Sequence, residues 1–176
     1  MRVVYGIDRA VPSRERSLAW RYRDDVPAEL EIAPIAVEQF EDLLPLIAAY
    51  QRFYEVAEVD DDRNRLFFRR FLAPSEDGLL LGARDEGRLV GYACLYWHFS
   101  SLEACESVLM NDLYVDESAR GQGVGRALIE AAAAVARERE VPFVEWSTAP
   151  DNETAQRLYD RTGAKRTEWF SYELRV

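Results

Sequence analysis

Apolar residues recur along the first half of the chain with spacings that predict a short strand and two helices. The strand is expected near residues 30–35, and a helix from residue 37 to about 54. Pro45 lies inside that helix and is expected to kink or interrupt it, because proline lacks a backbone donor. The aspartates at residues 60–62 are suited to cap a second helix. Its apolar positions are Leu66, Phe67, Phe71 and Leu72.

The second half of the chain alternates strands with helices. Its predicted elements are, in order, strands at 79–84, 89–97 and 106–115, a helix at 124–138, a strand at 141–148, a helix at 152–162 and a strand at 169–176. The first two strands form a hairpin, because a turn sequence at residues 85–88 joins them. Gly163 suits the left-handed position that follows a helix.

This order of elements predicts one mixed sheet with helices on its faces, an α/β (α+β) architecture. The folded domain is expected at residues 29–176. Residues 1–28 have no steady period and are interpreted as an N-terminal extension. No apolar run approaches the ~18 residues of a membrane span, and the first 16 residues do not resemble a signal peptide. We therefore expect a cytoplasmic protein without a membrane partner.

The charge balance narrows the classes of partner. The chain has 22 Lys and Arg against 32 Asp and Glu, a formal net charge of -10. Such a chain is a poor general nucleic-acid binder, whereas a cationic small substrate is attracted to it. The two cysteines have no C-x-x-C spacing, so neither a disulfide scaffold nor a metal site is expected. His98 is the only histidine and is expected in a loop, without partners for a triad or a metal cluster.

The most informative segment is a polar loop with three glycines between the strand at 106–115 and the helix at 124–138. Gly121, Gly123 and Gly125 allow backbone N–H groups to approach a phosphate, and the helix N-terminus adds about half a positive charge. The segment has no lysine, so it is not a P-loop, and its G-x-G-x-G spacing does not fit the dinucleotide fingerprint. The alternative is that the glycines only shape a tight turn.

Residues 120–125, RGQGVG, resemble the R-x-x-G-x-G/A signature of the GNAT superfamily of N-acetyltransferases. Residues 152–164 look like that family's N-x-x-A-x-x-[LF]-Y…G-[AF] segment, about 30 residues further on. The resemblance covers about residues 29–176. It implies the GNAT fold, whose mostly antiparallel sheet splays at the acetyl-CoA site.

The resemblance also assigns roles to residues of this chain. It implies that Tyr159 is the general acid beside the thioester sulfur, and that Asn152 contacts the CoA arm. The backbone of Leu113, Tyr114 and Val115 is expected to pair with the pantetheine. The pyrophosphate is expected on the glycine loop, at Arg120, Gly121, Gln122, Gly123, Val124, Gly125 and Arg126.

The implied reaction needs a base, because only about one alkyl amine in a thousand is neutral at pH 7. Residues 110–115 resemble the L-[EN]-D-[LF]-[FY]-V segment of diamine and polyamine acetyltransferases, many of which have Glu at the position of Asn111. Asparagine cannot accept a proton, so Asp112, Glu145 or a water chain to one of them is the candidate. Alternate strand residues face opposite sides, so only Asn111 or Asp112 is expected to face the cleft.

The acceptor is expected to meet aromatic and acidic side chains, a combination that suits a cation. The candidates are Tyr50, Phe53, Tyr54, Glu55 and Asn111, with Trp97, Trp146 and Trp169 on an opposite wall. We expect a small primary amine, with diamines and polyamines favoured. The alternatives are a protein or peptide amine, and a CoA-binding module without turnover. A homodimer is also expected, with the C-terminal strand pairing or exchanging across a two-fold axis.

Overall fold

A single sheet of five strands, in the order β1-β2-β3-β4-β5, organises the protein in a computed structural model that describes residues 30–176. The strands are β1 (Glu31–Pro34), β2 (Gly78–Asp85), β3 (Arg88–Ser100), β4 (Cys105–Val115) and β5 (Val144–Glu145). Neighbours from β1 to β4 are antiparallel, and β5 runs parallel to β4. The mixed, mostly antiparallel sheet confirms the predicted fold class.

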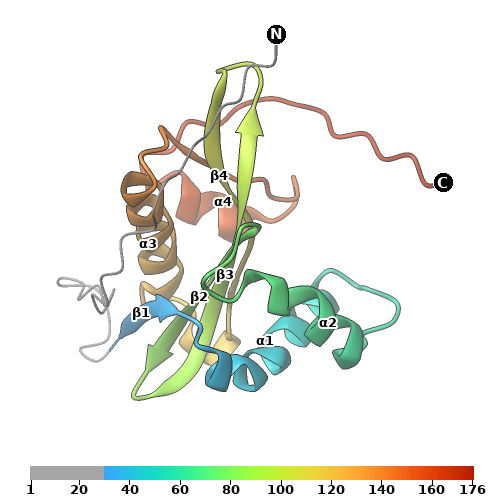
Figure 1. Ribbon diagram of the computed structural model, residues 1–176. Coiled ribbons are helices and arrows are strands. Elements are labelled where there is room, and N and C mark those ends of the chain that lie inside the picture. The colour runs from blue at the N-terminus through green and yellow to red at the C-terminus, as the bar shows by residue number, and fades with distance from the viewer. Residues whose placement is uncertain (1–29) are drawn as a thin grey trace, which may run out of the picture.

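Helices cover both faces of this sheet (Figure 1). They are α1 (Phe40–Phe53), α2 (Asp61–Phe68), α3 (Val124–Glu138) and α4 (Glu153–Tyr159), with short 3-10 turns η1 (Val37–Gln39), η2 (Arg69–Phe71) and η3 (Glu117–Ala119). Successive strand residues point to opposite faces. Leu81 therefore belongs to the apolar cluster under α3, and Leu80 to the cluster under α1 and α2.

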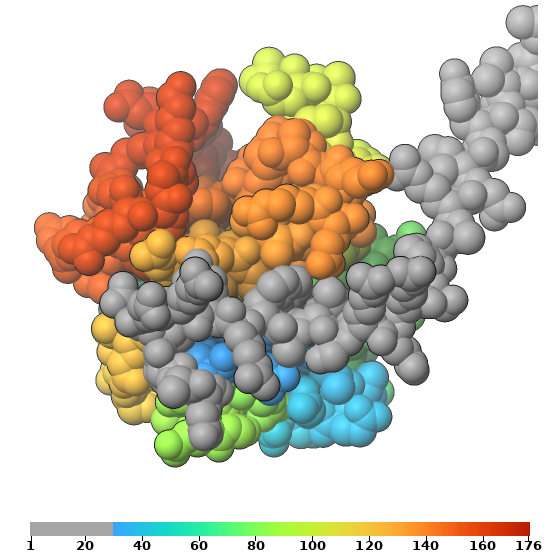
Figure 2. Space-filling model, turned by 90° about the vertical axis from the view of Figure 1, so that its left-hand side faces the viewer, coloured from blue at the N-terminus to red at the C-terminus, as the bar shows by residue number. Residues whose placement is uncertain are grey.

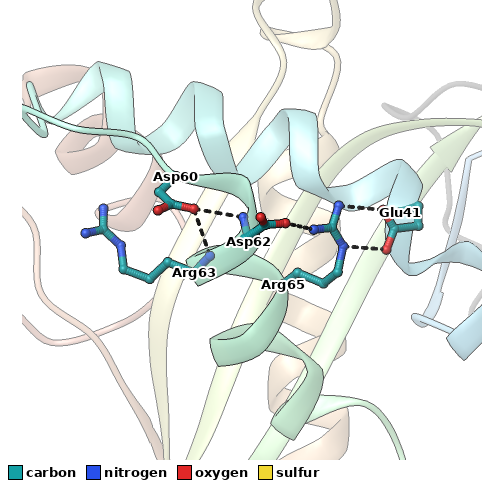
Figure 3. A network of polar contacts seen from close by, with 5 residues as sticks. All are labelled: Glu41, Asp60, Asp62, Arg63 and Arg65. Atoms are coloured by element: carbon teal, nitrogen blue, oxygen red, sulfur yellow. Dashed lines mark hydrogen bonds and ion pairs between the residues drawn. The ribbon is translucent and has the colours of Figure 1, made fainter.

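Polar contacts fix the start of α2 and its place beside α1 (Figure 3). The Asp60 carboxylate accepts the backbone N–H groups of Asp62 and Arg63 at 2.9 and 3.0 Å, which confirms the predicted cap. Arg65 reaches across to Glu41 of α1 with two hydrogen bonds of 2.9 and 3.1 Å. Such exposed ion pairs contribute at most about 1 kcal/mol, so they orient α2 more than they stabilise it.

The buried face of α2 differs from the prediction. Leu66 is 82% exposed and Phe67 is also exposed, whereas Phe68 and Asn64 are buried. The side-chain amides of Asn64 and Gln51 bond each other in both directions, at 2.7 and 2.8 Å. This pair satisfies the hydrogen-bonding groups of both side chains between α1 and α2. Asn64 can therefore be buried on the face of α2 where the apolar pattern had predicted Leu66 and Phe67.

Pro45 does not interrupt α1, which runs as one helix through it. The missing proline N–H would have bonded the carbonyl of Glu41, four residues earlier. Both residues are exposed, so water can satisfy that carbonyl.

The last two predicted strands are largely absent. Only Val144 and Glu145 of the segment 141–148 pair as a strand, and residues 165–176 are not in a strand at all. Residues 165–176 extend away from the folded domain, beside the tip of the β3–β4 hairpin (Figures 1 and 2). Trp169, predicted to line the acceptor wall, is 81% exposed in this segment. An alternating pattern indicates that a segment could have one apolar and one polar face, but it does not supply a neighbouring strand to pair with. The nearest strand in sequence, β5, offers an edge of only two residues.

Two further predictions concern Gly163 and the N-terminal extension. Gly163 adopts the expected left-handed conformation, with φ of 81°. The extension predicted at residues 1–28 lies outside the described residues. Among residues 30–176, no helix has the length and apolarity needed to cross a membrane.

Candidate active site

The sheet opens between β4 and β5. Their pairing consists of Val108 with Val144 and Leu109 with Glu145, and it ends there although β4 continues to Val115. Within residues 30–176, this edge of β4 has no strand partner beyond Leu109. An unpaired strand edge can bind an extended ligand through backbone hydrogen bonds. The splayed sheet implied by the sequence resemblance is therefore present.

A β-bulge lies beside this opening. Met110 pairs with Leu95 and Asp112 pairs with Cys94, so Asn111 is the extra residue of β4. The Asn111 Nδ2 donates a 3.0 Å hydrogen bond to Oδ1 of Asp112. The bulge removes the strict alternation on which the expectation of a single cleft-facing residue rested, and Asn111 is exposed whereas Asp112 is buried.

Asp112 is a buried carboxyl group, with only 6% of the residue exposed. Burial raises its pKa to about 6, against the opposing effect of hydrogen bonds from Tyr50 and Asn111. The same burial, together with the Asp112 charge, raises the pKa of the Tyr50 hydroxyl. A carboxyl group that titrates near neutral pH is a candidate for proton transfer.

Aromatic rings surround Tyr50 at the end of α1. The ring centroid of Tyr50 lies 5.0 Å from that of Tyr54 and 6.2 Å from those of Tyr92 and Tyr114. Phe53 packs edge-on against Tyr54 at 5.0 Å. The structure therefore brings the predicted aromatic residues of α1 together above Asp112.

Trp97 is not part of this cluster. Its ring packs under the Arg139 guanidinium at 3.8 Å, and its Nε1 donates to the carbonyl of Ser75 at 3.1 Å. It packs against the apolar cluster on the α3 side of the sheet, as Trp146 and Tyr159 also do, but it has no ring contact with the aromatic side chains around Tyr50.

Tyr159, the last residue of α4, lies near the same opening. Burial raises its pKa to about 12, and Tyr54 adds to the increase, so the phenol keeps its proton at neutral pH. Its ring is 5.4 Å from that of Trp146, which follows β5 directly. Asn152 caps α4 by accepting the Ala155 N–H at 3.1 Å. One region of the structure thus contains three residues that were predicted from the sequence, Tyr159, Trp146 and Asn152.

A cleft of about 600 Å³ separates the end of α1 from the start of α4. It is lined by Phe53, Tyr54, Glu55, Ala149, Asp151, Asn152, Glu153, Thr154 and Arg157. Three of these residues carry carboxylates, and the guanidinium of Arg157 is paired with Glu153 at 3.2 Å. The cleft therefore has excess negative charge next to aromatic rings, which favours a cation.

The glycine loop leaves the N-terminus of α3 without a side-chain cap. Gly123 is the N-cap residue, with φ of 81°, and no acidic residue lies in the first turn. By contrast, Asp60 caps α2 and Asn152 caps α4. The first N–H groups of a helix have no partner within it, so an uncapped start is suited to bind an anion. Gly121, with φ of 77°, turns the chain toward this start.

Other residues of the loop have structural contacts. A Cβ on Gly125 would lie 3.0 Å from Leu158 Cδ2, so glycine allows α3 to approach α4 closely. Arg120 donates from Nε to the Val115 carbonyl at 3.0 Å, and Arg126 pairs with Glu130 at 2.9 Å. The two arginines thus flank the loop from opposite ends.

One polar cluster was missed by sequence reasoning. His98 lies within β3, not in a loop, and its Nδ1 is 3.0 Å from Oε1 of Glu145. Ser107 donates to the same oxygen at 3.0 Å. The prediction ended the strand at Trp97, and continuing it by one residue would have made His98 a strand residue across from β4.

Comparisons with known proteins agree with this arrangement. The family model described as "Acetyltransferase (GNAT) family" matches residues 41–164. A D-amino-acid N-acetyltransferase of Saccharomyces cerevisiae is 41% identical over 100 residues, which are 56% of this chain and 62% of that protein. The chain thus spans less than two thirds of this relative. An uncharacterized N-acetyltransferase of Bacillus subtilis is 28% identical over 73% of this chain and 85% of its own length.

Solved structures extend the comparison. The crystal structure of a probable acetyltransferase has a TM-score of 0.73 and 31% identity, covering 82% of this chain and 97% of the other. An aminoglycoside N-acetyltransferase in complex with CoA also has a TM-score of 0.73, with 18% identity over 83% of this chain and 94% of the other. At that identity the second likeness shows the fold alone.

Proposed function

The chain belongs to the acetyltransferase (GNAT) family, and we propose that it transfers the acetyl group of acetyl-CoA to a primary amine of a small cationic molecule. The observation that carries the proposal is the pair of titrating groups at the β4–β5 opening. Asp112, with its pKa of about 6, and Tyr159, with its pKa of about 12, both act on the titration of Tyr50. Amine acetylation requires a proton donor for the leaving thiolate at such an opening, which the protonated phenol of Tyr159 provides, and the Asp112 carboxylate adds negative charge that favours a cationic amine.

Acetyl-CoA is the proposed co-substrate of the domain at residues 29–176. Its pyrophosphate would lie at the uncapped start of α3, on the backbone of the loop from Arg120 to Arg126. The left-handed φ angles of Gly121 and Gly123 support this placement, because side chains are absent where the phosphate would approach. The pantetheine would pair with the unpaired edge of β4 from Leu113 to Val115.

In the proposed reaction the neutral amine attacks the thioester carbonyl, forming a C–N bond as the C–S bond breaks. The amine loses two protons, one before attack and one as the intermediate collapses. An alkyl thiolate, with a conjugate-acid pKa of about 8.5, is a weaker base than a phenolate of pKa about 12. Tyr159 therefore stabilises the thiolate by hydrogen bonding and transfers its proton as it receives one from the amine.

The acceptor that we propose is a diamine or polyamine. The carboxylates of Glu55, Asp151 and Glu153 line the cleft beside Phe53 and Tyr54, and the chain has a net charge of -10. A second cationic group on the acceptor would be attracted to this cleft. The second candidate is the α-amine of an amino acid, because a relative that is 41% identical is a D-amino-acid N-acetyltransferase.

Thiol release from acetyl-CoA, measured with a panel of amines, tests this proposal. The panel contains spermidine, putrescine, D- and L-amino acids, an aminoglycoside and a peptide with a free N-terminus. We expect the highest kcat/KM with the diamines or polyamines. A preference for amino acids would identify these as the acceptor in place of diamines and polyamines. A preference for the peptide would identify a protein or peptide acetyltransferase. CoA binding without turnover on any amine would identify a CoA-binding module without catalytic activity.

We also propose a homodimer in a reducing cytoplasm. Five large apolar side chains are exposed in the last eight residues, Trp169, Phe170, Tyr172, Leu174 and Val176. A second copy would cover this segment by pairing it as a strand. Cys94 and Cys105 are both free thiols, in keeping with a reducing compartment. Light scattering of the full chain and of a chain ending at residue 166 tests the dimer, since only the full chain should dimerise.

A further inference from the structure

We propose that His98, held by Glu145, is the group that accepts the proton from the acceptor amine. This inference rests on the proposed acetyl transfer and names a base for it. Sequence reasoning had considered Glu145 itself and Asp112. The structure instead places a half-exposed imidazole against the Glu145 carboxylate.

The hydrogen bonds determine which ring nitrogen is basic. Oε1 of Glu145 lies 3.0 Å from His98 Nδ1 and 3.0 Å from Ser107 Oγ. An ionised carboxylate only accepts hydrogen bonds, so both neighbours must be donors. Nδ1 therefore carries the hydrogen, and in the neutral imidazole the lone pair is on Nε2. This is the carboxylate–imidazole arrangement that orients a general base.

The cluster lies on the acceptor side of the sheet. His98 is opposite Ser107 in the β3–β4 register, and Cys94, four residues before His98, is opposite Asp112. Because side chains alternate along a strand, His98 and Cys94 share a face. Cys94 belongs to the apolar cluster under α1, together with Tyr92 and Tyr114. His98 and Asp112 are thus on one face, separated by about 13 Å along the strand.

Along the sheet, His98 and Glu145 lie at the point where β4 and β5 begin to separate. Glu145 is the last residue of β5 paired with β4, at Leu109, and the strands part directly after it. Trp146, the next residue, contacts Tyr159, the proposed acid. His98 and Tyr159 therefore flank the region in which β4 and β5 separate. We place the acceptor amine in this region, where the imidazole would accept its proton directly or through water.

Accessibility separates His98 from Asp112. The His98 side chain is 48% exposed, whereas Asp112 is almost fully buried. The carboxylate of Asp112 already accepts the Asn111 amide at 3.0 Å and a bond from Tyr50. Its burial keeps it from an ammonium group that arrives from solvent. Asp112 is therefore a positioning residue, which holds Tyr50 and the bulge in place.

One of the two amine protons leaves through His98 and the other through Tyr159. The ammonium proton moves to Nε2 of His98 and from there to solvent, while the nitrogen lone pair forms the C–N bond. The C–S bond breaks, Tyr159 protonates the thiolate, and the second amine proton restores Tyr159. The charged group facing His98 is Glu145 of β5, and β4 contributes the uncharged hydroxyl of Ser107 at 3.4 Å.

The test compares two acceptors in one variant. His98→Asn keeps an N–H near the position of Nδ1 but removes the basic Nε2. With an alkyl amine we expect kcat/KM to fall by about 100-fold, because a general base contributes at least about that factor. With an amine whose conjugate acid has a pKa below about 6, the nitrogen is already neutral at pH 7, and we expect less than about a five-fold change. The affinity for acetyl-CoA should not change.

Glu106→Gln is the matched control. Glu106 is an exposed carboxylate of β4 that pairs with Arg139 at 3.6 Å, and it alternates with Ser107 to the opposite face. It should leave both acceptors unaffected. His98→Ala with added imidazole is the second variant, and imidazole should restore part of the activity with the alkyl amine.

The outcomes are distinct. An equal loss with both amines, or no imidazole rescue, would make His98 structural and overturn the inference. An unchanged kcat/KM in His98→Asn would do the same and return the role to Asp112. In either case the wild type still acetylates amines, so the proposed function stands. A wild type without amine-dependent turnover would overturn both.

Discussion

Replacement of Asp112 by asparagine should stabilise the protein at neutral pH. Burial raises the pKa of this carboxyl group from 3.8 to about 6, so the folded state disfavours its ionised form. The shift is roughly two units, and each unit corresponds to about 1.4 kcal/mol. Ionisation of Asp112 above pH 6 therefore destabilises the folded protein by about 3 kcal/mol. Asparagine keeps the carbonyl oxygen that accepts from Asn111 and removes the charge.

The sign of the pH dependence follows from the raised pKa. The destabilisation is fully present above the folded pKa of about 6 and disappears as the pH falls toward the unfolded value of 3.8. The gap between Asp112→Asn and wild type should thus be about 3 kcal/mol near pH 7.5 and roughly half of that near pH 5. For a domain of this size, 3 kcal/mol corresponds to a Tm increase of about 6–12 °C.

Thermal and urea denaturation at the two pH values measure this gap. Glu103→Gln, which removes an exposed carboxylate from the β3–β4 turn, is the control and should change neither value. A variant less stable than wild type at neutral pH would refute the reasoning, and so would a gap of equal size at both pH values. The same variant should keep its activity within about ten-fold, since Asp112 is not the proton acceptor; a general base would cost at least about 100-fold.

Three further predictions concern the acid, the loop and the core. Tyr159→Phe should lower kcat by about 10²-fold or more with little change in CoA affinity, as measured by steady-state kinetics and titration calorimetry. Gly123→Trp should weaken CoA binding by more than about ten-fold, whereas Gly87→Trp, at φ of 77° in the exposed β2–β3 turn, carries the same backbone strain and should not. Leu128→Ala removes a fully buried side chain and should lower the free energy of unfolding by about 2–5 kcal/mol in urea, against a negligible effect of Leu102→Ala on the exposed hairpin.

The sequence was sufficient for elements whose ends are marked by local chemistry. The start of α2 follows from Asp60, the start of α4 from Asn152, and α3 follows the glycine loop directly. These features depend on hydrogen bonds within a few residues, so a local pattern contains them. The central strands were predictable for a similar reason, because their apolar runs are long.

The errors arise where distant parts of the chain decide the outcome. The bulge at Asn111 depends on the register between β3 and β4, and it cancels the alternation expected there. The contact of His98 with Glu145 joins strands that are 47 residues apart. The segment at 169–176 alternates well, but it pairs with none of the strands of the sheet. Sequence periodicity carries no information on partners of this kind.

The most direct test of the account is the stoichiometry of the reaction with its preferred amine. CoA release and N-acetylated product are measured together, by thiol titration and mass spectrometry, with acetyl-CoA or the amine omitted in turn. The account predicts one N-acetyl product for each CoA released, and neither when one substrate is missing. CoA release that does not depend on the amine, or the absence of any acetylated amine, would contradict it.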